Sequence, residues 1–208
     1  MNGDVAILIT VAVGFAALVG GAVWLGRTAH QRTRENLRAL ADRLGLTFAP
    51  GKGWFGHPRA DGRRRGKPLE LFNYTTGSGK SRQVWSAIRA RPAAAGDLTF
   101  TIRPQGFGTK VLGFFGAKEI AVGDRAFDDA WFVRTNQPDF FRAALIPEIR
   151  DKFAAARQAG AKGHFALEKG VVVYAEAGTF YDRGRCARFE TLAEVVCDLA
   201  DIAEVSIR

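Results

Sequence analysis

The chain has few residues of the types that build common catalytic or metal sites. Its 208 residues include only two cysteines and three histidines, and the sequence contains no HExxH, CxxC or GxSxG pattern. These absences argue against a zinc protease, a CxxC redox or zinc site, and a serine hydrolase with a nucleophile elbow. We therefore predict no catalytic residues, no metal site and no cofactor. An enzyme of an unrecognised class is the third of our functional hypotheses.

The two cysteines are also badly placed for a crosslink. Cys186 and Cys197 are eleven positions apart. On one helix this spacing returns them to the same face but separates them by roughly 16 Å, which is beyond disulfide reach. Reduced thiols indicate a reducing compartment.

Charged residues are absent from one long stretch near the N-terminus. Residues 5–25 read VAILITVAVGFAALVGGAVWL and include no Asp, Glu, Lys or Arg. As a helix this run would be about 31 Å long, which matches a hydrocarbon core of about 30 Å. We predict a transmembrane helix over residues 5–26, preceded by a short extracytoplasmic tail, residues 1–4. Small residues at four-residue spacing, Ala12, Ala16 and Gly20, would allow a homodimer through this helix.

The residues on either side of the run predict its orientation. Asp4 precedes it, whereas Arg27, Arg32, Arg34 and Arg38 follow it. Because cytoplasmic flanks carry an excess of Lys and Arg, we expect the N-terminus outside and the C-terminal domain in the cytoplasm. A cleaved signal peptide would instead begin with positive charge and have a shorter apolar stretch.

Most of the excess positive charge follows the apolar run. The net charge is +9, and residues 27–67 hold eleven Lys or Arg against three acidic residues. The four arginines of the basic juxtamembrane helix, residues 27–45, are therefore candidates for contact with anionic lipid headgroups. The alternative is that they only set the topology. We expect no nucleic-acid partner, because such a domain would carry its charge on the folded part, interleaved with aromatic residues.

The apolar pattern predicts how the chain continues beyond the membrane. Leu37, Leu40, Ala41 and Leu44 form one helical stripe that should end at Gly45. Beyond it we expect strands at 46–48, 68–74, 82–90, 97–103, 118–123 and 129–135, a helix at 138–158 broken near Pro147, two strands at 164–176, and a helix at 187–205.

This order of elements predicts the fold class. Strands come in runs and do not alternate regularly with helices, so residues 46–208 should form one soluble α+β domain. We expect a mostly antiparallel sheet closed by the C-terminal amphipathic helix.

Two motifs suggest binding sites but have structural explanations. Residues 77–81, GSGKS, end like a phosphate-binding loop, yet Tyr74 occupies the place of its first glycine, so we predict a hairpin connection. Asp124, Asp128 and Asp129 could bind a hard cation, but a turn flanked by aromatic residues is the preferred interpretation.

Basic residues provide the remaining candidates for an anion-binding site. Arg183, Arg185 and Arg188 lie near the start of the last helix, and Lys80 and Arg82 lie in the predicted hairpin connection. Anions favour helix N-termini, and nearby arginines would strengthen that preference. The alternative is a solvated arginine cluster.

The chain resembles a family of uncharacterised bacterial membrane-anchored proteins. The likeness lies in the order of an N-terminal apolar span, a basic helix, GSGKSRQVW, GDRAFDDAWFVRTN and a closing amphipathic helix. Its specific part is the motif G-D-x-x-F-D-x-x-[FW]-x-V at residues 123–133. The resemblance implies a bacterial plasma-membrane address, but it implies no activity and no site residues.

These observations favour a binding role for a tethered domain. Our leading hypothesis is a non-enzymatic, single-pass membrane protein whose cytoplasmic domain binds a protein partner or the lipid surface. Tethering suits such a role because it raises the effective concentration of weak partners. The alternative is a domain that binds a small ligand or anion at the basic residues named above.

Overall fold

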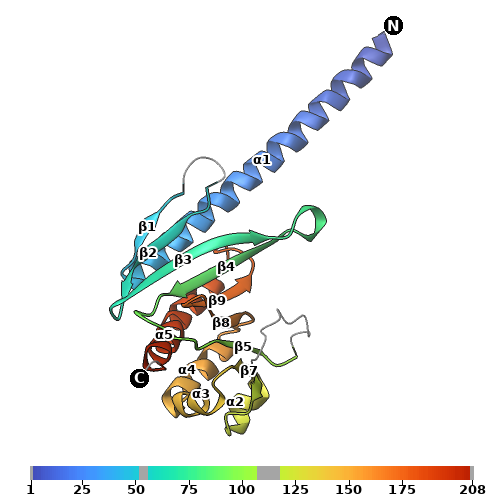
Figure 1. Cartoon of the computed structure of the whole chain (residues 1–208). Helices are drawn as coiled ribbons and strands as arrows, with labels where there is room; N and C mark the ends of the chain where they lie inside the picture. Colours follow the sequence, from blue (N-terminus) through green and yellow to red (C-terminus); the bar gives the residue numbers. More distant parts are fainter. Residues whose placement is uncertain (1, 52–55, 107–117, 207–208) are drawn as a thin grey trace.

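The structure consists of one long helix that projects from an α+β domain (Figure 1). It is a computed structural model that describes residues 2–51, 56–106 and 118–206, and for residues 2–13 and 16 only the helical backbone. The N-terminus lies at the free end of the helix, and the C-terminus lies at the opposite end of the domain.

The strands of the described residues form one antiparallel sheet. In chain order they are β1 (Thr47–Ala49), β2 (Arg59–Arg64), β3 (Lys67–Thr76), β4 (Gln83–Ala90), β5 (Phe100–Pro104), β6 (Lys118–Ile120), β7 (Trp131–Thr135), β8 (His164–Glu168) and β9 (Val171–Ala177). Their order across the sheet is β1-β2-β3-β4-β9-β8-β5-β7-β6, and every neighbouring pair is antiparallel. The predicted α+β class with a mostly antiparallel sheet is confirmed.

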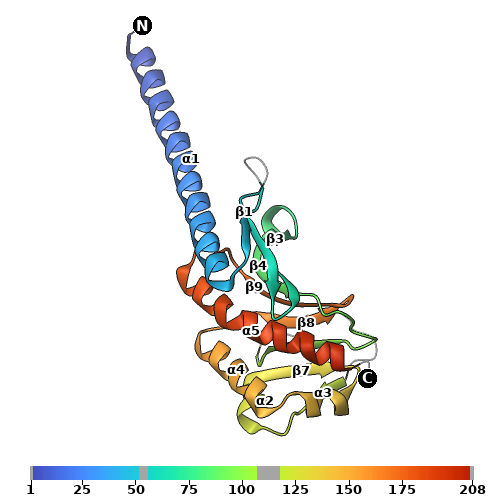
Figure 2. The ribbon, with the colours of Figure 1, turned by 90° about the vertical axis from the view of Figure 1, so that its left-hand side faces the viewer.

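The helices pack on one side of this sheet. They are α1 (Asn2–Leu44), α2 (Arg125–Ala130), α3 (Pro138–Ala144), α4 (Pro147–Gln158) and α5 (Arg183–Val205), with a short 3-10 turn η1 (Gly79–Ser81). Figure 2 views the sheet from the side of α5, which crosses it between the end of α1 and α4. Leu71, Ile88 and Phe165 from the sheet join Leu192 and Val196 of α5 in the hydrophobic core. The predicted closing helix therefore packs on the sheet.

The second half of α1 belongs to this core. Leu37, Leu40, Ala41 and Leu44 are all buried, which confirms the predicted stripe. Gly45 ends the helix with a positive φ of 69°, a backbone conformation that glycine adopts without strain. The two segments predicted separately, residues 5–26 and 27–45, form one continuous helix.

The transmembrane prediction is not confirmed by this structure. Within the residues whose side chains are described, no helix is long and apolar enough to cross a membrane. Residues 5–13 and 16 of the predicted span, and with them Ala12 and Ala16, lie outside the described side chains.

Several element boundaries were predicted correctly. The two-strand prediction at 164–176 corresponds to β8 and β9, which turn at Lys169 and Gly170. The helix predicted to break near Pro147 is divided into α3 and α4, because Pro147 begins a new helix. GSGKS joins β3 to β4, which confirms the predicted hairpin connection.

Other elements were missed or misplaced. β2 was not predicted, because its sequence RADGRR has one buried apolar side chain, Ala60, and otherwise reads as loop. α5 starts at Arg183, before the predicted residue 187, because Asp182 caps it by accepting a hydrogen bond from the Gly184 N–H (2.8 Å).

Candidate functional site

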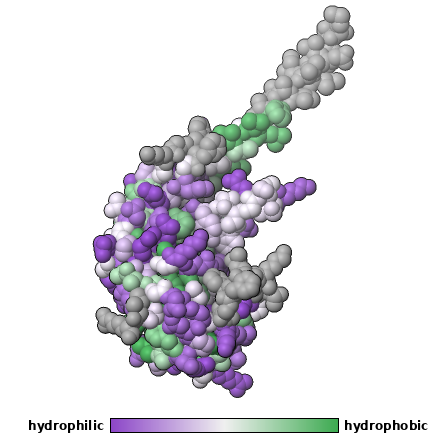
Figure 3. Space-filling view, in the orientation of Figure 1, coloured by the Kyte–Doolittle hydropathy of each residue, from purple (hydrophilic) through white to green (hydrophobic). Residues whose placement is uncertain are grey.

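The free part of α1 exposes large apolar side chains. Phe15, Leu18, Trp24 and Leu25 have exposed fractions of 69%, 75%, 65% and 62%. In Figure 3 this described part of the helix is a continuous hydrophobic surface that projects from a largely hydrophilic domain. Exposed apolar surfaces of this kind mark contacts with a membrane or another protein.

The four arginines that follow the predicted span differ in their surroundings. Arg27, Arg32 and Arg38 are exposed, whereas Arg34 is half-buried. Arg32 donates a hydrogen bond to the Tyr181 hydroxyl (2.8 Å), and the Arg38 guanidinium lies 5.1 Å from the centre of the Phe48 ring. Two of these predicted lipid-contact residues thus also hold α1 against the domain.

The predicted arginine cluster at the start of α5 has an internal partner. Glu176 on β9 is 2% exposed, and its Oε1 accepts hydrogen bonds from Arg185 (2.6 Å) and Arg188 (2.8 Å). Its Oε2 accepts a bond from the Tyr174 hydroxyl (2.7 Å). We call these four residues the Glu176 cluster. Arg183 is exposed and lies outside it.

The cluster keeps a charge ionised inside the domain. Burial alone would raise the pKa of Glu176, but hydrogen bonds from Arg188, Arg185 and Tyr174 outweigh it and lower that pKa. Burial, with the neighbouring Glu176 carboxylate, raises the pKa of Tyr174, so its hydroxyl remains protonated and donates. The guanidinium groups of Arg185 and Arg188 therefore form ion pairs with Glu176 of the same chain. An external anion would have to compete with that carboxylate.

A glycine makes room for this arrangement. Gly178 has a φ of 114°, and a Cβ built there would collide with the Arg185 guanidinium. That guanidinium also donates to the carbonyl oxygens of Thr179 and Ala177. Sequence reasoning missed Glu176. Alternate residues of a strand face the same side, so Glu176 faces inward with Val172 and Tyr174.

The other two basic candidates lie elsewhere. Lys80 and Arg82 are exposed at the tip of the β3–β4 hairpin, beside η1. Arg185 and Arg188 are half-buried where α5 packs on β9, so the structure does not bring the five basic candidates together into one site.

The acidic motif is used for local structure. Asp124 caps α2 by accepting a hydrogen bond from the Phe127 N–H (3.2 Å), and Asp128 accepts bonds from the Val122 and Gly123 N–H groups. Asp129 is exposed, with Arg125 3.7 Å away. The segment predicted as a turn is instead the short helix α2, and two of its three carboxylates accept hydrogen bonds from backbone N–H groups.

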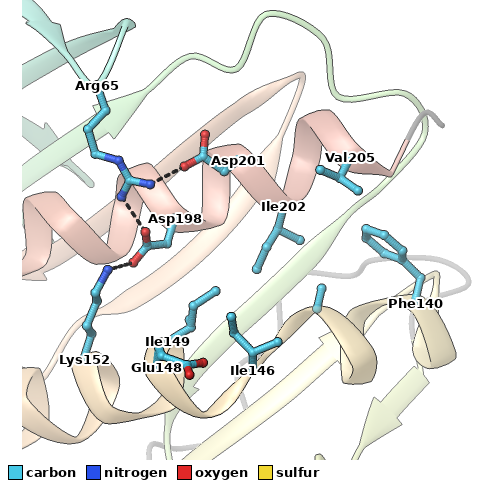
Figure 4. Close-up of a pocket in the computed structure, with 11 residues that line it drawn as sticks. Arg65, Phe140, Ile146, Glu148, Ile149, Lys152, Asp198, Asp201, Ile202 and Val205 are labelled. Atoms are coloured by element: carbon cyan, nitrogen blue, oxygen red, sulfur yellow. Dashed lines mark hydrogen bonds and ion pairs between the residues drawn. The ribbon is translucent and has the colours of Figure 1, made fainter.

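A groove of about 400 Å³ opens between α5 and the α3–α4 corner (Figure 4). Apolar side chains from both sides face it: Phe140, Ala144, Ile146, Ile149, Ile202 and Val205. Ile146 and Val205 are 47% and 54% exposed, so the apolar lining of the groove is partly open to solvent. Sequence reasoning did not single out this groove, because it is assembled from two distant segments.

Ion pairs close one end of the groove. Asp198 on α5, 7% exposed in its side chain, accepts hydrogen bonds from Arg65 of the β2–β3 turn and from Lys152 of α4 (2.6 Å). Arg65 also bonds Asp201 (2.6 Å). Figure 4 shows these contacts beside the apolar side chains, so the groove has an apolar floor and one charged end.

Comparisons with known proteins concern the fold. The chain matches no protein-family model, and no curated protein sequence is significantly similar to it. One solved structure is similar: the crystal structure of the mycobacterial trehalose monomycolate transport factor A, TtfA. The two share 14% sequence identity with a TM-score of 0.55, over 85% of this chain and 94% of the other. At that identity the likeness shows a common fold for nearly the whole of both chains.

Proposed function

We propose that this chain is a membrane-tethered domain that acts by binding a protein partner and is not an enzyme. The observation that carries the proposal is the exposed apolar surface of α1, which includes Phe15, Leu18 and Leu25. The helical backbone continues from there to Asn2, through sequence that is free of charge from residue 5 onward. A bilayer is the natural partner for such a surface.

The continuity of α1 supports a stiff tether. The helix passes without a break from exposed apolar residues to Leu37, Leu40 and Leu44, which are core residues of the domain. The domain would therefore be held in a fixed orientation relative to the bilayer. The excess of arginines after the apolar run supports a cytoplasmic position for the domain, and the resemblance to bacterial membrane-anchored proteins supports a bacterial plasma membrane.

The groove is the surface we assign to the partner. It lies at the C-terminal end of α5, whereas α1 contacts the N-terminal part of α5, where Arg43 bonds Glu190 (2.8 Å). A tethered domain would thus present the groove away from the bilayer, where a protein can reach it. Its apolar floor and charged end suit a partner segment that inserts apolar side chains next to a polar one. The structural neighbour of this fold is described as a transport factor, a role that a binding domain could serve.

Fractionation tests the tether. Deleting residues 1–26 should move the protein from membranes to the soluble fraction, because the exposed apolar surface is removed and the core stripe is kept. A truncated protein that stays firmly in washed membranes would contradict the proposal.

Affinity capture from gently solubilised membranes tests the groove. A partner should be retained by the full chain and lost with Ile146→Asp, which places a carboxylate on the exposed apolar floor. Ala143→Asp is the matched control, because Ala143 is exposed on α3 and does not line the groove. Equal recovery of the partner with both variants would exclude the groove as its binding site.

A further inference from the structure

The end of the β3–β4 hairpin extends beyond the rest of the sheet. β3 and β4 pair as far as Thr76 and Gln83, but β2 pairs with β3 only to Phe72, and β9 pairs with β4 only to Trp85. We call residues 75–83 the arm. Residues 76–83 are all exposed. An isolated two-stranded hairpin is only marginally stable in water. We therefore looked for contacts that stabilise the arm and for a function that its extension could serve.

The base of the arm is held rigidly. The rings of Tyr74 and Trp85 stack with centroids 6.3 Å apart, and the Trp85 indole N–H donates to the Thr76 hydroxyl (2.8 Å). At the tip, Gly77 has a φ of 72°, and a Cβ there would collide with the Ser81 carbonyl oxygen. The arm is therefore a defined structure with a tight turn.

The arm and the free part of α1 leave the domain on the same side. In Figures 1 and 2 both lie opposite α2, α3 and the C-terminus. Their bases are joined by one loop: the Gly178 N–H donates to Val84 of β4, and Asn36 of α1 donates to the carbonyl oxygens of Phe180 and Tyr181.

Because both elements contact the same loop, their lengths can be compared from that loop outward. From Asn36 to Arg27 a helix rises about 14 Å, and the two residue steps from Val84 to Arg82 add about 7 Å before the turn itself. The tip can thus approach the level at which the apolar surface of α1 gives way to its first arginine.

The chemistry of the tip suits an anionic surface. Residues 75–83 read TTGSGKSRQ, with Lys80 and Arg82 and no acidic residue. Neither cation forms an ion pair with a carboxylate among the described residues. Each cation near an anionic bilayer surface favours the bound state by about fivefold, so two together favour it by about 25-fold.

We propose that the arm is a second contact with the membrane, in which Lys80 and Arg82 bind the phosphates of anionic lipid headgroups. The inference rests on the proposed tether and adds a fixed orientation to it. With α1 in the bilayer and the arm on its surface, the domain has two points of support, and the groove faces away.

A depth measurement on the full-length protein in vesicles tests this. A fluorophore is attached at Ser78→Cys at the tip or at Lys169→Cys in the β8–β9 turn. The native Cys186 and Cys197 are buried and remain unlabelled. The two sites lie at opposite ends of the sheet, because β9 runs antiparallel to β4 from Val172 beside Ala90 to Ala177 beside Trp85. Vesicles contain phosphatidylglycerol or only phosphatidylcholine, with a quencher on the headgroup.

In phosphatidylglycerol vesicles we expect strong quenching at residue 78 and little at residue 169. Lys80→Ala with Arg82→Ala should lower the ratio of membrane-contacting to free tips by about 25-fold, and phosphatidylcholine alone or about 1 M salt should also lower it. Flotation of the same samples separates the two proposals. Protein that does not float contradicts the tether, whereas protein that floats with equal quenching at both sites contradicts the arm contact alone.

Discussion

At the scale of single residues, Glu176 is a buried carboxylate whose bonding partners all belong to the domain itself. Its carboxylate is buried and shared by Arg185, Arg188 and Tyr174. Removing one partner of a buried pair leaves the others without compensation.

Glu176→Gln should therefore lower the free energy of unfolding by about 3–5 kcal/mol. Denaturation in urea, followed by tryptophan fluorescence, measures this change. Glu168→Gln on the neighbouring strand is the control, because Glu168 is exposed and surface changes usually stay within about 0.5 kcal/mol. Similar losses for both variants would contradict the assignment.

The same carboxylate predicts a dependence on pH. The pKa of Glu176 is lower in the folded protein than its ordinary value of 4.5, so the unfolded chain binds more protons in acid. The contribution of Glu176 to stability is thus fully present above about pH 4.5 and is lost as the pH falls through the folded pKa. Unfolding curves between pH 7 and 3 should show a steeper loss for the wild type than for Glu176→Gln. Parallel curves would exclude a lowered pKa.

The two thiols should be inert in the folded protein. Cys186 and Cys197 are 4% and 0% exposed, and burial raises the pKa of each to about 11. At pH 8 neither forms much thiolate, which is the reactive species. A chromogenic disulfide reagent should react with no thiol in buffer and with two in denaturant. Rapid reaction of either thiol in buffer would show that α5 opens.

At the scale of elements, the β2–β3 turn fastens the sheet to α5. Lys67 is 7% exposed in its side chain and bonds Asp201 (2.8 Å) and Glu204 (2.7 Å). Burial would lower the pKa of Lys67, but these two carboxylates raise it, so the ammonium stays charged. Arg65 in the same turn bonds Asp198 and Asp201.

Lys67→Ala should lower the free energy of unfolding by about 2 kcal/mol, because a buried stem and two ion pairs are lost together. Arg59→Ala on β2 provides the comparison. Its pair with Asp61 is 3.7 Å long and more than half exposed, so its removal should change stability by less than about 0.5 kcal/mol. Thermal unfolding of the two variants measures the difference. Equal shifts in melting temperature would argue that the Lys67 ion pairs do not stabilise the packing of the β2–β3 turn on α5.

Elements also show where sequence reasoning succeeded and where it failed. Alternation at Phe100 and Ile102 and the helical stripe at Leu192 and Val196 were read correctly, because one face of each element is buried. β2 was missed because it is held by backbone pairing with β1 and β3, which side-chain patterning does not report.

At the scale of the whole molecule, α1 has two roles along its length. Its described residues before Arg27 include exposed apolar side chains such as Phe15, Leu18 and Leu25, and its last turns complete the core through Leu37, Leu40 and Leu44. Burial of each such leucine contributes about 1.5–3 kcal/mol, so the three together approach the net stability of a domain.

Two truncations should therefore behave differently. A chain that starts at Arg27 should fold, whereas one that starts at Leu46 should be largely unfolded, because it lacks the whole stripe. Circular dichroism and amide proton NMR distinguish these states. A well-dispersed spectrum from the shorter chain would show that α1 is dispensable for the fold.

The sequence by itself determined the features that depend on local pattern: the charge-free N-terminal run, the α+β class, the break at Pro147, and the hairpin at GSGKS. Each follows from residue type and spacing along the chain. Only the tertiary structure decided that Arg185 and Arg188 bond Glu176 and that a groove forms between α5 and the α3–α4 corner. These features arise where segments far apart in sequence meet, and the free energy that selects such contacts comes from shared burial and charge pairing, which no single segment carries.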